Sequence, residues 1–142
     1  MCAVGDIIRI ESYISEDGVD MSRHSFIVID DESSTISGYS YDFIANVMSS
    51  FKSEKHKEKK LRYLENILIT EEDRDCNPEN GKEAYIKADQ LYYFDKSKIN
   101  YTVMGTATDE IMNTIYDVIE ILDRQDKLKI NIRNTIKEEV AG

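Results

Sequence analysis

The chain has 142 residues, 41% of them hydrophobic, with one proline, six glycines and a formal net charge of −10. This composition excludes a repeat protein and an extended disordered chain, and it predicts one globular domain. No apolar stretch approaches the ~20 residues of a membrane helix, and the N-terminus lacks a basic flank and a hydrophobic signal core. We therefore expect a cytoplasmic protein without a membrane contact.

The first strands are predicted near the N-terminus. β-Branched and aromatic residues dominate residues 7–14 and 26–29, which is typical of strands. Residues 15–20 between them include an Asp-Gly pair, which tolerates the positive φ of a tight turn, so an antiparallel pair is expected. Residues 41–51 have an apolar spacing that fits both a strand and a helix, and we favour the strand.

Residues 52–62 concentrate positive charge. Six basic residues stand there against two acidic ones, a net charge of +4, which leaves −14 for the rest of the chain. We interpret this segment as a loop, either one that meets phosphate groups or a solvated connection without a partner. The basic residues, our candidates for an RNA contact, are Lys52, Lys55, Lys57, Lys59, Lys60 and Arg62.

The second half of the chain continues with short strands. Residues 64–69 predict a strand, and residues 71–81 predict an acidic, polar loop with Asn-Pro and Asn-Gly pairs. Residues 84–99 form a strand-like run that ends in the charged turn Asp95-Lys96. Several short strands in this order favour a small, partly open barrel.

A helix is predicted next. Thr108 or Thr106 can cap its first amides, and the acids that follow Thr108 suit the positive end of the helix dipole. An apolar stripe at helical spacing is expected to pack on the barrel, and its members are Ile111, Ile115, Val118, Ile119 and Leu122. Beyond residue 125, the tail either extends the helix, adds an edge strand or covers a partner surface.

The expected fold is thus mainly β with a C-terminal amphipathic helix, an α+β fold built on a small, partly open SH3-like barrel. We expect a barrel domain over residues 1–126 and a tail over residues 127–142. Cys2 and Cys76 belong to no Cys-x-x-Cys or Cys-His cluster, which favours reduced thiols. No glycine-rich phosphate loop, zinc motif or nucleophile elbow occurs, so no cofactor and no metal are predicted.

Four features together resemble one family. They are the strand 5–10, the run 23–29 beginning Arg-His-Ser-Phe, the run 86–90 with the turn Asp95-Lys96, and the helix about ten residues later. In this order and spacing they resemble PemK/MazF-type toxins of type II toxin–antitoxin systems, from Gly5 to Leu122. The resemblance implies the PemK/MazF/CcdB type of barrel.

This resemblance also implies an activity. Such toxins are metal-independent endoribonucleases that cleave single-stranded RNA, act as homodimers and are held inactive by a cognate antitoxin. The nucleophile is the 2′-hydroxyl of the RNA itself. The protein therefore has to remove a proton, stabilise the charged transition state and protonate the leaving 5′-oxygen.

The family pattern places the site on two strands. Arg23 matches the arginine at the start of the second strand, where a guanidinium can hold two phosphate oxygens. His24 stands where the family usually has proline, and an imidazole there is either an acid or base or a structural side chain. For the hydroxyl at the end of the third strand, strict register gives Met48 and a one-residue bulge gives Ser49, with Ser50 next to it.

Two other functions remain open. The departures at His24 and Ser49 and the acidity outside residues 52–62 also suit a barrel that has lost its chemistry and serves as a protein-binding module of a mobile genetic element. A barrel that binds nucleic acid without cleaving it ranks last, and a salt-dependent RNA complex without product would identify it.

Overall fold

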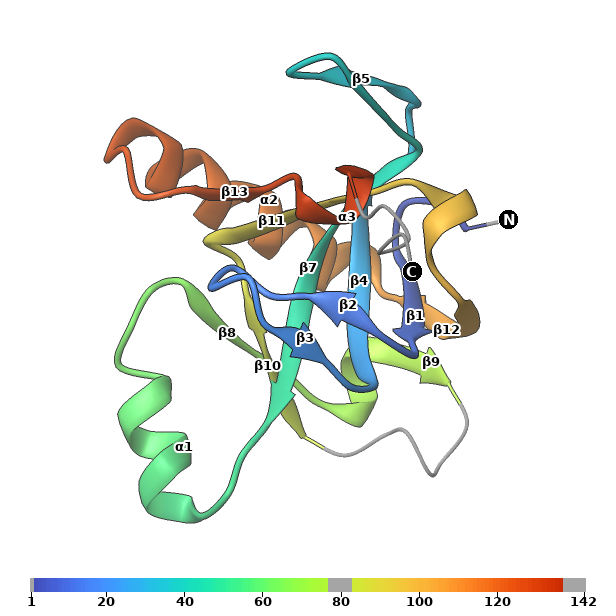
Figure 1. Cartoon of the computed structure of the whole chain (residues 1–142). Helices are drawn as coiled ribbons and strands as arrows, with labels where there is room; N and C mark the ends of the chain where they lie inside the picture. The colour runs from blue at the N-terminus through green and yellow to red at the C-terminus, as the bar shows by residue number, and fades with distance from the viewer. Residues whose placement is uncertain (1, 77–82, 137–142) are drawn as a thin grey trace.

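The computed structural model describes residues 2–76 and 83–136, and it is mainly β with a few helices (Figure 1). The strands are β1 (Asp6–Ile10), β2 (Tyr13–Ile14), β3 (Asp20–Met21), β4 (His24–Asp30), β5 (Ser34–Ile36), β6 (Tyr39–Tyr41), β7 (Phe43–Ser50), β8 (Asn66–Ile69), β9 (Arg74–Cys76), β10 (Ala84–Lys87), β11 (Gln90–Phe94), β12 (Tyr101–Ala107) and β13 (Lys129–Asn131). The helices are α1 (Glu54–Lys60), α2 (Asp109–Arg124) and α3 (Arg133–Ile136), with 3₁₀ turns at Glu71–Asp73 and Lys96–Lys98.

One large sheet organises the chain. Its strands follow the order β13-β11-β7-β4-β1-β12-β9, and β10 extends it by pairing with β7 and β8. The neighbours are antiparallel except β11 and β13, which are parallel. The order has two ends, so the sheet is open. The prediction of a mainly β, small α+β fold is confirmed at this level.

Both faces of the sheet are buried, because alternate residues of the central strands point to opposite sides. Ile7 and Ile27 pair across β1 and β4 and pack with the apolar stripe of α2. The adjacent pair, Ile8 and Phe26, points the other way, into a cluster rich in aromatic rings. In Figure 1, α2 therefore lies behind the sheet and the β2–β3 hairpin in front of it.

The strand predicted at residues 41–51 is confirmed as β7, but the loop predicted at residues 52–62 is wrong. Residues 54–60 form helix α1, which projects from one end of the sheet (Figure 1). Ser53 caps it, with Oγ accepting from the amide of His56 at 3.1 Å. Lysine and glutamate are good helix formers, so this local sequence supports a helix although none of its residues is buried.

The acidic loop predicted at residues 71–81 is also partly wrong. Its first residues form a 3₁₀ turn, and residues 74–76 form β9, which pairs with β12. Residues 77–81 lie outside the described part of the chain. β9 has little strand character of its own and is held by its pairing, since Gly105 stands opposite Cys76 in that register.

The strand-like run 84–99 consists of two strands that share a neighbour. β10 lies beside the end of β7 and β11 beside its start, with Tyr85 opposite Ser49 and Tyr93 opposite Ile44. The two strands are thus successive parts of one edge of β7, separated by residues 88–89. On its other side β10 pairs with β8, and β11 pairs with β13.

The predicted helix is confirmed as α2. Thr108 is its N-cap, with Oγ1 accepting from the amide of Ile111 at 3.4 Å. The buried stripe includes Ile111, Ile115, Val118 and Leu122. All four belong to the apolar cluster between α2 and the sheet that also contains Ile7 and Ile27, which we call the helix-side cluster. Ile119 is partly buried against the same cluster.

Removing the Thr108 hydroxyl is expected to lower the free energy of unfolding. Thr108→Ala deletes the cap of α2, and we expect a loss of about 1 kcal/mol. Thr114→Ala makes the same substitution at an exposed position inside α2 and is expected to raise stability by up to about 0.7 kcal/mol, because alanine is the better helix former. Chemical denaturation measures both; effects of the same sign and size would contradict the capping role.

The described part of the tail, residues 127–136, forms an edge strand, one of the three alternatives left open by the sequence. β13 pairs with β11, placing Leu91 opposite Ile130. Residues 134 and 135 then bury their side chains, and Lys98 donates through Nζ to the carbonyl oxygen of Thr135 at 2.8 Å. The tail thereby packs against the sheet and against the β2–β3 hairpin.

Candidate functional site

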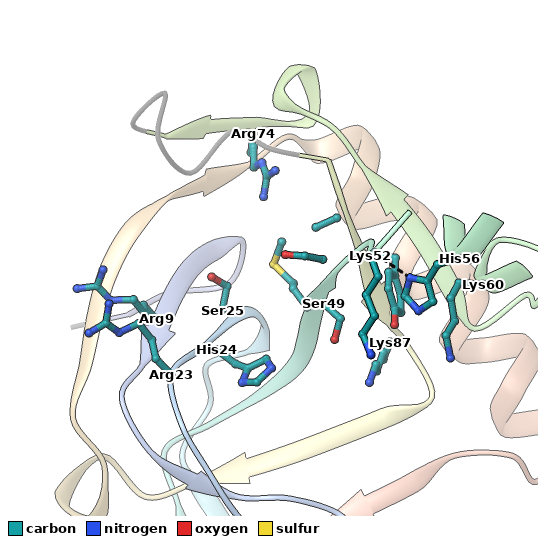
Figure 2. A pocket seen from close by; sticks show the side chains of 14 residues that line it. Arg9, Arg23, His24, Ser25, Ser49, Lys52, His56, Lys60, Arg74 and Lys87 are labelled. Carbon is teal, nitrogen blue, oxygen red and sulfur yellow. Dashed lines mark hydrogen bonds between the residues drawn. The ribbon is translucent and has the colours of Figure 1, made fainter. Parts of the chain in front are cut away.

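A large open cavity of about 740 Å³ lies where β4 begins and β7 ends. Figure 2 shows Arg9 and Arg23 on one side of it and Lys52, Lys87, His56 and Lys60 on the other. His24, Ser25 and Ser49 lie between these two sides, and Arg74 reaches in from β9. We call this the cationic cavity; its remaining lining residues are Met48, Ser50, Ala84 and Tyr85.

The charge of this cavity is opposite to that of the protein as a whole. Six of the eighteen Lys and Arg residues and both histidines line it. None of its lining residues within the described ranges is an Asp or Glu, although the chain carries 28 acids. A concave site of one charge focuses its field and attracts anions even when the net charge of the protein is negative.

Arg9 and Arg23 share one carboxylate. Nε of Arg23 donates to Oε2 of Glu11 at 3.0 Å, and Nε of Arg9 lies 3.3 Å from Oε1 of the same side chain. The Arg23 side chain is nevertheless 61% exposed. Glu11 thus holds Arg23 by a hydrogen bond to Nε and Arg9 by an ion pair, and most of the Arg23 side chain, with its terminal nitrogens, stays open to the solvent. A phosphate can therefore approach Arg23 in the two-pronged manner that arginine favours.

His24 presents a defined tautomer. Nδ1 lies 3.1 Å from the carbonyl oxygen of Ser22, and since a carbonyl only accepts, Nδ1 donates there. Nε2 is then the basic nitrogen of the neutral ring. The ring meets Tyr13 edge to face at 5.6 Å, which fixes its orientation. A neutral His24 can therefore accept a proton at Nε2.

Ser49 lies in the same row of the sheet as His24. On one side of β7, Tyr85 of β10 stands opposite Ser49. On the other side, Phe26 of β4 stands opposite Val47, and continuing this antiparallel register by two residues places His24 opposite Ser49. Opposed residues share a face of the sheet. Met48 also reaches the cavity, but its side chain is buried in the helix-side cluster. Ser50, at the strand end, lines the cavity too and is exposed.

His56 stays neutral near neutral pH. Its Nδ1 accepts from the amide of Lys52 at 3.1 Å, which a protonated ring could not do. Desolvation, followed by the charges of Lys60 and Lys52, lowers the pKa of His56 below its usual range. The wall of the cavity formed by α1 therefore has lysine charge and a neutral imidazole side by side.

The titration of His56 tests this electrostatic description. We expect its imidazole carbon signals, followed by NMR, to titrate below the ordinary histidine value of about 6.5. Lys60→Gln should move the pKa upward, because it removes the largest charge contribution, whereas Lys55→Gln on the same helix should leave it nearly unchanged. Saturating phosphate should also raise it. A pKa at or above the ordinary value in the unmodified protein would contradict the description.

Lys87 projects from the end of β10 into the same space. Its side chain is half-buried, and burial, followed by the charge of Lys60, lowers the pKa of its ammonium group. Nζ lies 5.9 Å from the centre of the Tyr85 ring. A lysine with a lowered pKa releases a proton more readily than an exposed one.

A second, smaller cavity of about 260 Å³ adjoins the first beneath the β2–β3 hairpin. We call it the hairpin cavity; it is lined by Tyr13, Ser15, Glu16, Asp17, Val19, Met21, His24, Val47, Ser49, Lys87, Gln90 and Tyr92. His24, Ser49 and Lys87 belong to both cavities. These three side chains mark the junction between a basic space and one with aromatic walls and an acidic rim.

The six basic residues proposed for RNA contact do not line one cavity. Lys52 and Lys60 line the cationic cavity. Lys57 instead donates to Glu83 at 2.7 Å. The others, Lys55, Lys59 and Arg62, line another hollow, which also contains Glu58 and shares only His56 with the cationic cavity. The helix divides a charge run that the sequence presents as continuous.

Four charged or titratable residues of the site were missed by sequence reasoning: Arg9, His56, Arg74 and Lys87. A signal existed for Arg9, the polar member of the alternating run Ile8-Arg9-Ile10, and for Lys87, which follows Ile86 in the same way. His56 lies within the basic segment. Arg74 had no local signal, because its position depends on the pairing of β9 with β12.

Comparison with known proteins leaves the family open. No protein-family model matches this chain, and no curated protein matches it. Within residues 2–76 and 83–136, no helix is long and apolar enough to cross a membrane. Across the same ranges, no three His, Cys, Asp or Glu side chains are grouped in a way that can hold a metal ion.

Proposed function

We propose that this protein is an endoribonuclease of the PemK/MazF toxin type that cleaves single-stranded RNA. The observation that carries the proposal is the cationic cavity, which gathers six Lys and Arg residues and both histidines in a chain of net charge −10. A polyphosphate chain is the ligand class that such a cavity attracts. At the junction of the two cavities, His24 adds a base, Ser49 a hydroxyl and Lys87 an acid next to this charge.

Four residues have separate roles in the proposed reaction. Nε2 of His24 takes the proton of the ribose 2′-hydroxyl, whose oxygen forms a bond to phosphorus. The bond between phosphorus and the 5′-oxygen breaks, and that oxygen receives a proton from the Lys87 ammonium group. Arg23 and the hydroxyl of Ser49 donate to the phosphate oxygens as charge develops. The products are a 2′,3′-cyclic phosphate and a 5′-hydroxyl, and the mechanism uses no metal ion.

The finer fold and the partners belong to the same proposal. The open sheet with a helix behind it is compatible with an SH3-like barrel of the PemK/MazF/CcdB type, the assignment suggested by the resemblance of residues 5–122. The same resemblance suggests a cytoplasmic homodimer and a cognate antitoxin. An acidic antitoxin segment would suit the cationic cavity by charge.

Cleavage of RNA in the presence of EDTA tests the proposal. We expect a mixed pool of single-stranded RNA to be cut, with cyclic phosphate ends on the 5′ fragments. An oligonucleotide with 2′-O-methyl groups should bind and remain intact, because it lacks the nucleophile. Binding of both RNAs without product would support a non-cleaving nucleic-acid-binding protein, and an absence of binding would favour the protein-binding module.

A further inference from the structure

We propose that the hairpin cavity binds the base of the nucleotide whose 2′-hydroxyl attacks, and that it prefers guanine. This inference rests on the proposed function and adds the specificity of the cut. The hairpin cavity meets the cationic cavity at His24, Ser49 and Lys87. A phosphate bound at this junction therefore has the hairpin cavity beside it, on the side away from the other cations.

The walls suit a flat ring. Tyr13, Val47 and Tyr92 are buried at 2–3% exposure, and the two tyrosine rings meet edge to face at 5.6 Å. The volume of about 260 Å³ lies below the ~300–1,000 Å³ of pockets that bury a drug-sized ligand, so it admits one ring system. An apolar, aromatic wall of this kind favours a nucleobase over a phosphate.

The rim supplies hydrogen-bond acceptors. Glu16 and Asp17 line the cavity from the turn of the hairpin, and a carboxylate only accepts hydrogen bonds. The Watson–Crick edge of guanine carries two adjacent donors, the ring N1–H and the 2-amino group, which match the two oxygens of one carboxylate. Uracil offers a single N–H between two carbonyl oxygens, which a carboxylate repels. The acidic rim therefore discriminates in favour of guanine.

The cavity is held open by the tail. Asn134 is fully buried and makes two hydrogen bonds to the backbone of Ile14, with its Oδ1 accepting from the amide at 2.8 Å and its Nδ2 donating to the carbonyl at 3.0 Å. Gly18 has a φ of +80°, and a Cβ there would lie 3.1 Å from Nη1 of Arg133. Nζ of Lys129 lies 3.7 Å from Oε1 of Glu16, an ion pair between β13 and the hairpin. These contacts fix the hairpin over its cavity, so a base meets a preformed site.

Binding of 3′-mononucleotides tests this subsite. We expect calorimetry to show that 3′-GMP binds roughly 5- to 150-fold more tightly than 3′-UMP, the range that one bidentate base contact provides. Inorganic phosphate should compete with both. The double variant Glu16→Gln, Asp17→Asn should lose the preference and keep its affinity for phosphate. Asp20→Asn, on the same hairpin but not among the lining residues, is the control and should retain the preference.

Two results would overturn the inference in different ways. Equal binding of 3′-GMP and 3′-UMP, or a preference that survives in the double variant, would reject the base subsite while phosphate binding upheld the cationic cavity. A failure of inorganic phosphate to bind at all would reject the subsite together with the proposed function. Circular dichroism of each variant checks that the hairpin substitutions leave the fold intact.

Discussion

Arg23→Ala is expected to reduce the rate of RNA cleavage by about 10²- to 10³-fold, the effect of removing one preorganised donor from a developing oxyanion. Arg23 lies at the mouth of the cationic cavity, where Glu11 holds its Nε and leaves its terminal nitrogens accessible. The loss should appear mainly in kcat, because these hydrogen bonds strengthen as charge builds on the phosphate. Single-turnover cleavage of a fluorescent RNA measures it.

Two matched variants make this result specific. Arg62→Ala removes an arginine from the same predicted RNA-binding set, but Arg62 lies outside the cationic cavity, so its cleavage rate should stay within about twofold of the unmodified protein. Arg23→Lys keeps the charge and loses the planar fork, and an intermediate rate is expected. Equal cleavage rates for Arg23→Ala and Arg62→Ala would show that Arg23 has no role in the reaction.

The second large effect concerns RNA affinity. The double variant Lys60→Gln, Lys87→Gln removes two cations from the cationic cavity. For single strands, each phosphate contact contributes about −0.7 to the slope of log K against log salt concentration, so losing two makes the slope less negative by about 1.4. If the two proteins bind equally at about 1 M salt, this weakens binding roughly 25-fold at about 0.1 M salt. Fluorescence anisotropy with a 2′-O-methyl RNA measures the slope without cleavage.

The control for this experiment lies on the same helix. Lys55→Gln, Lys59→Gln changes the net charge by the same amount but affects the hollow on the other side of α1. We expect a much smaller change in slope. If both double variants weaken binding equally, RNA responds to the overall charge of the basic segment, and the cavity has no special part in binding.

Much of the fold follows from local sequence. The β-branched and aromatic residues at 7–14 and the β-branched run 26–29 predict strands that the structure contains as β1, with the short β2 after it, and β4. Thr108 and the stripe behind it predict α2, because capping and helical spacing are both local properties. In these segments, propensity and burial favour the same conformation.

The failures have two physical causes: helix α1 has local signals but no apolar stripe, and the positions of β9 and β13 depend on information that is not local. Residues 54–60 have no apolar stripe, so their helix shows only in propensity and in the Ser53 cap. β9 depends on β12, and β13 depends on β11. For the site, sequence reasoning supplied Arg23, His24 and Ser49 from one resemblance. The convergence of Arg9, Arg74 and Lys87 on them follows only from the pairing of distant strands.

We propose that a phosphate of single-stranded RNA binds at the junction of His24, Ser49 and Lys87. A crystal structure with a short 2′-O-methyl RNA tests it most directly. We predict a phosphate oxygen within the ~2.6–3.2 Å of a direct hydrogen bond from Ser49 Oγ, with the 2′-oxygen of the preceding ribose beside His24 Nε2 and a base under the β2–β3 hairpin. RNA bound instead along Lys55, Lys59 and Arg62, with the junction empty, would contradict the proposed site and the mechanism built on it.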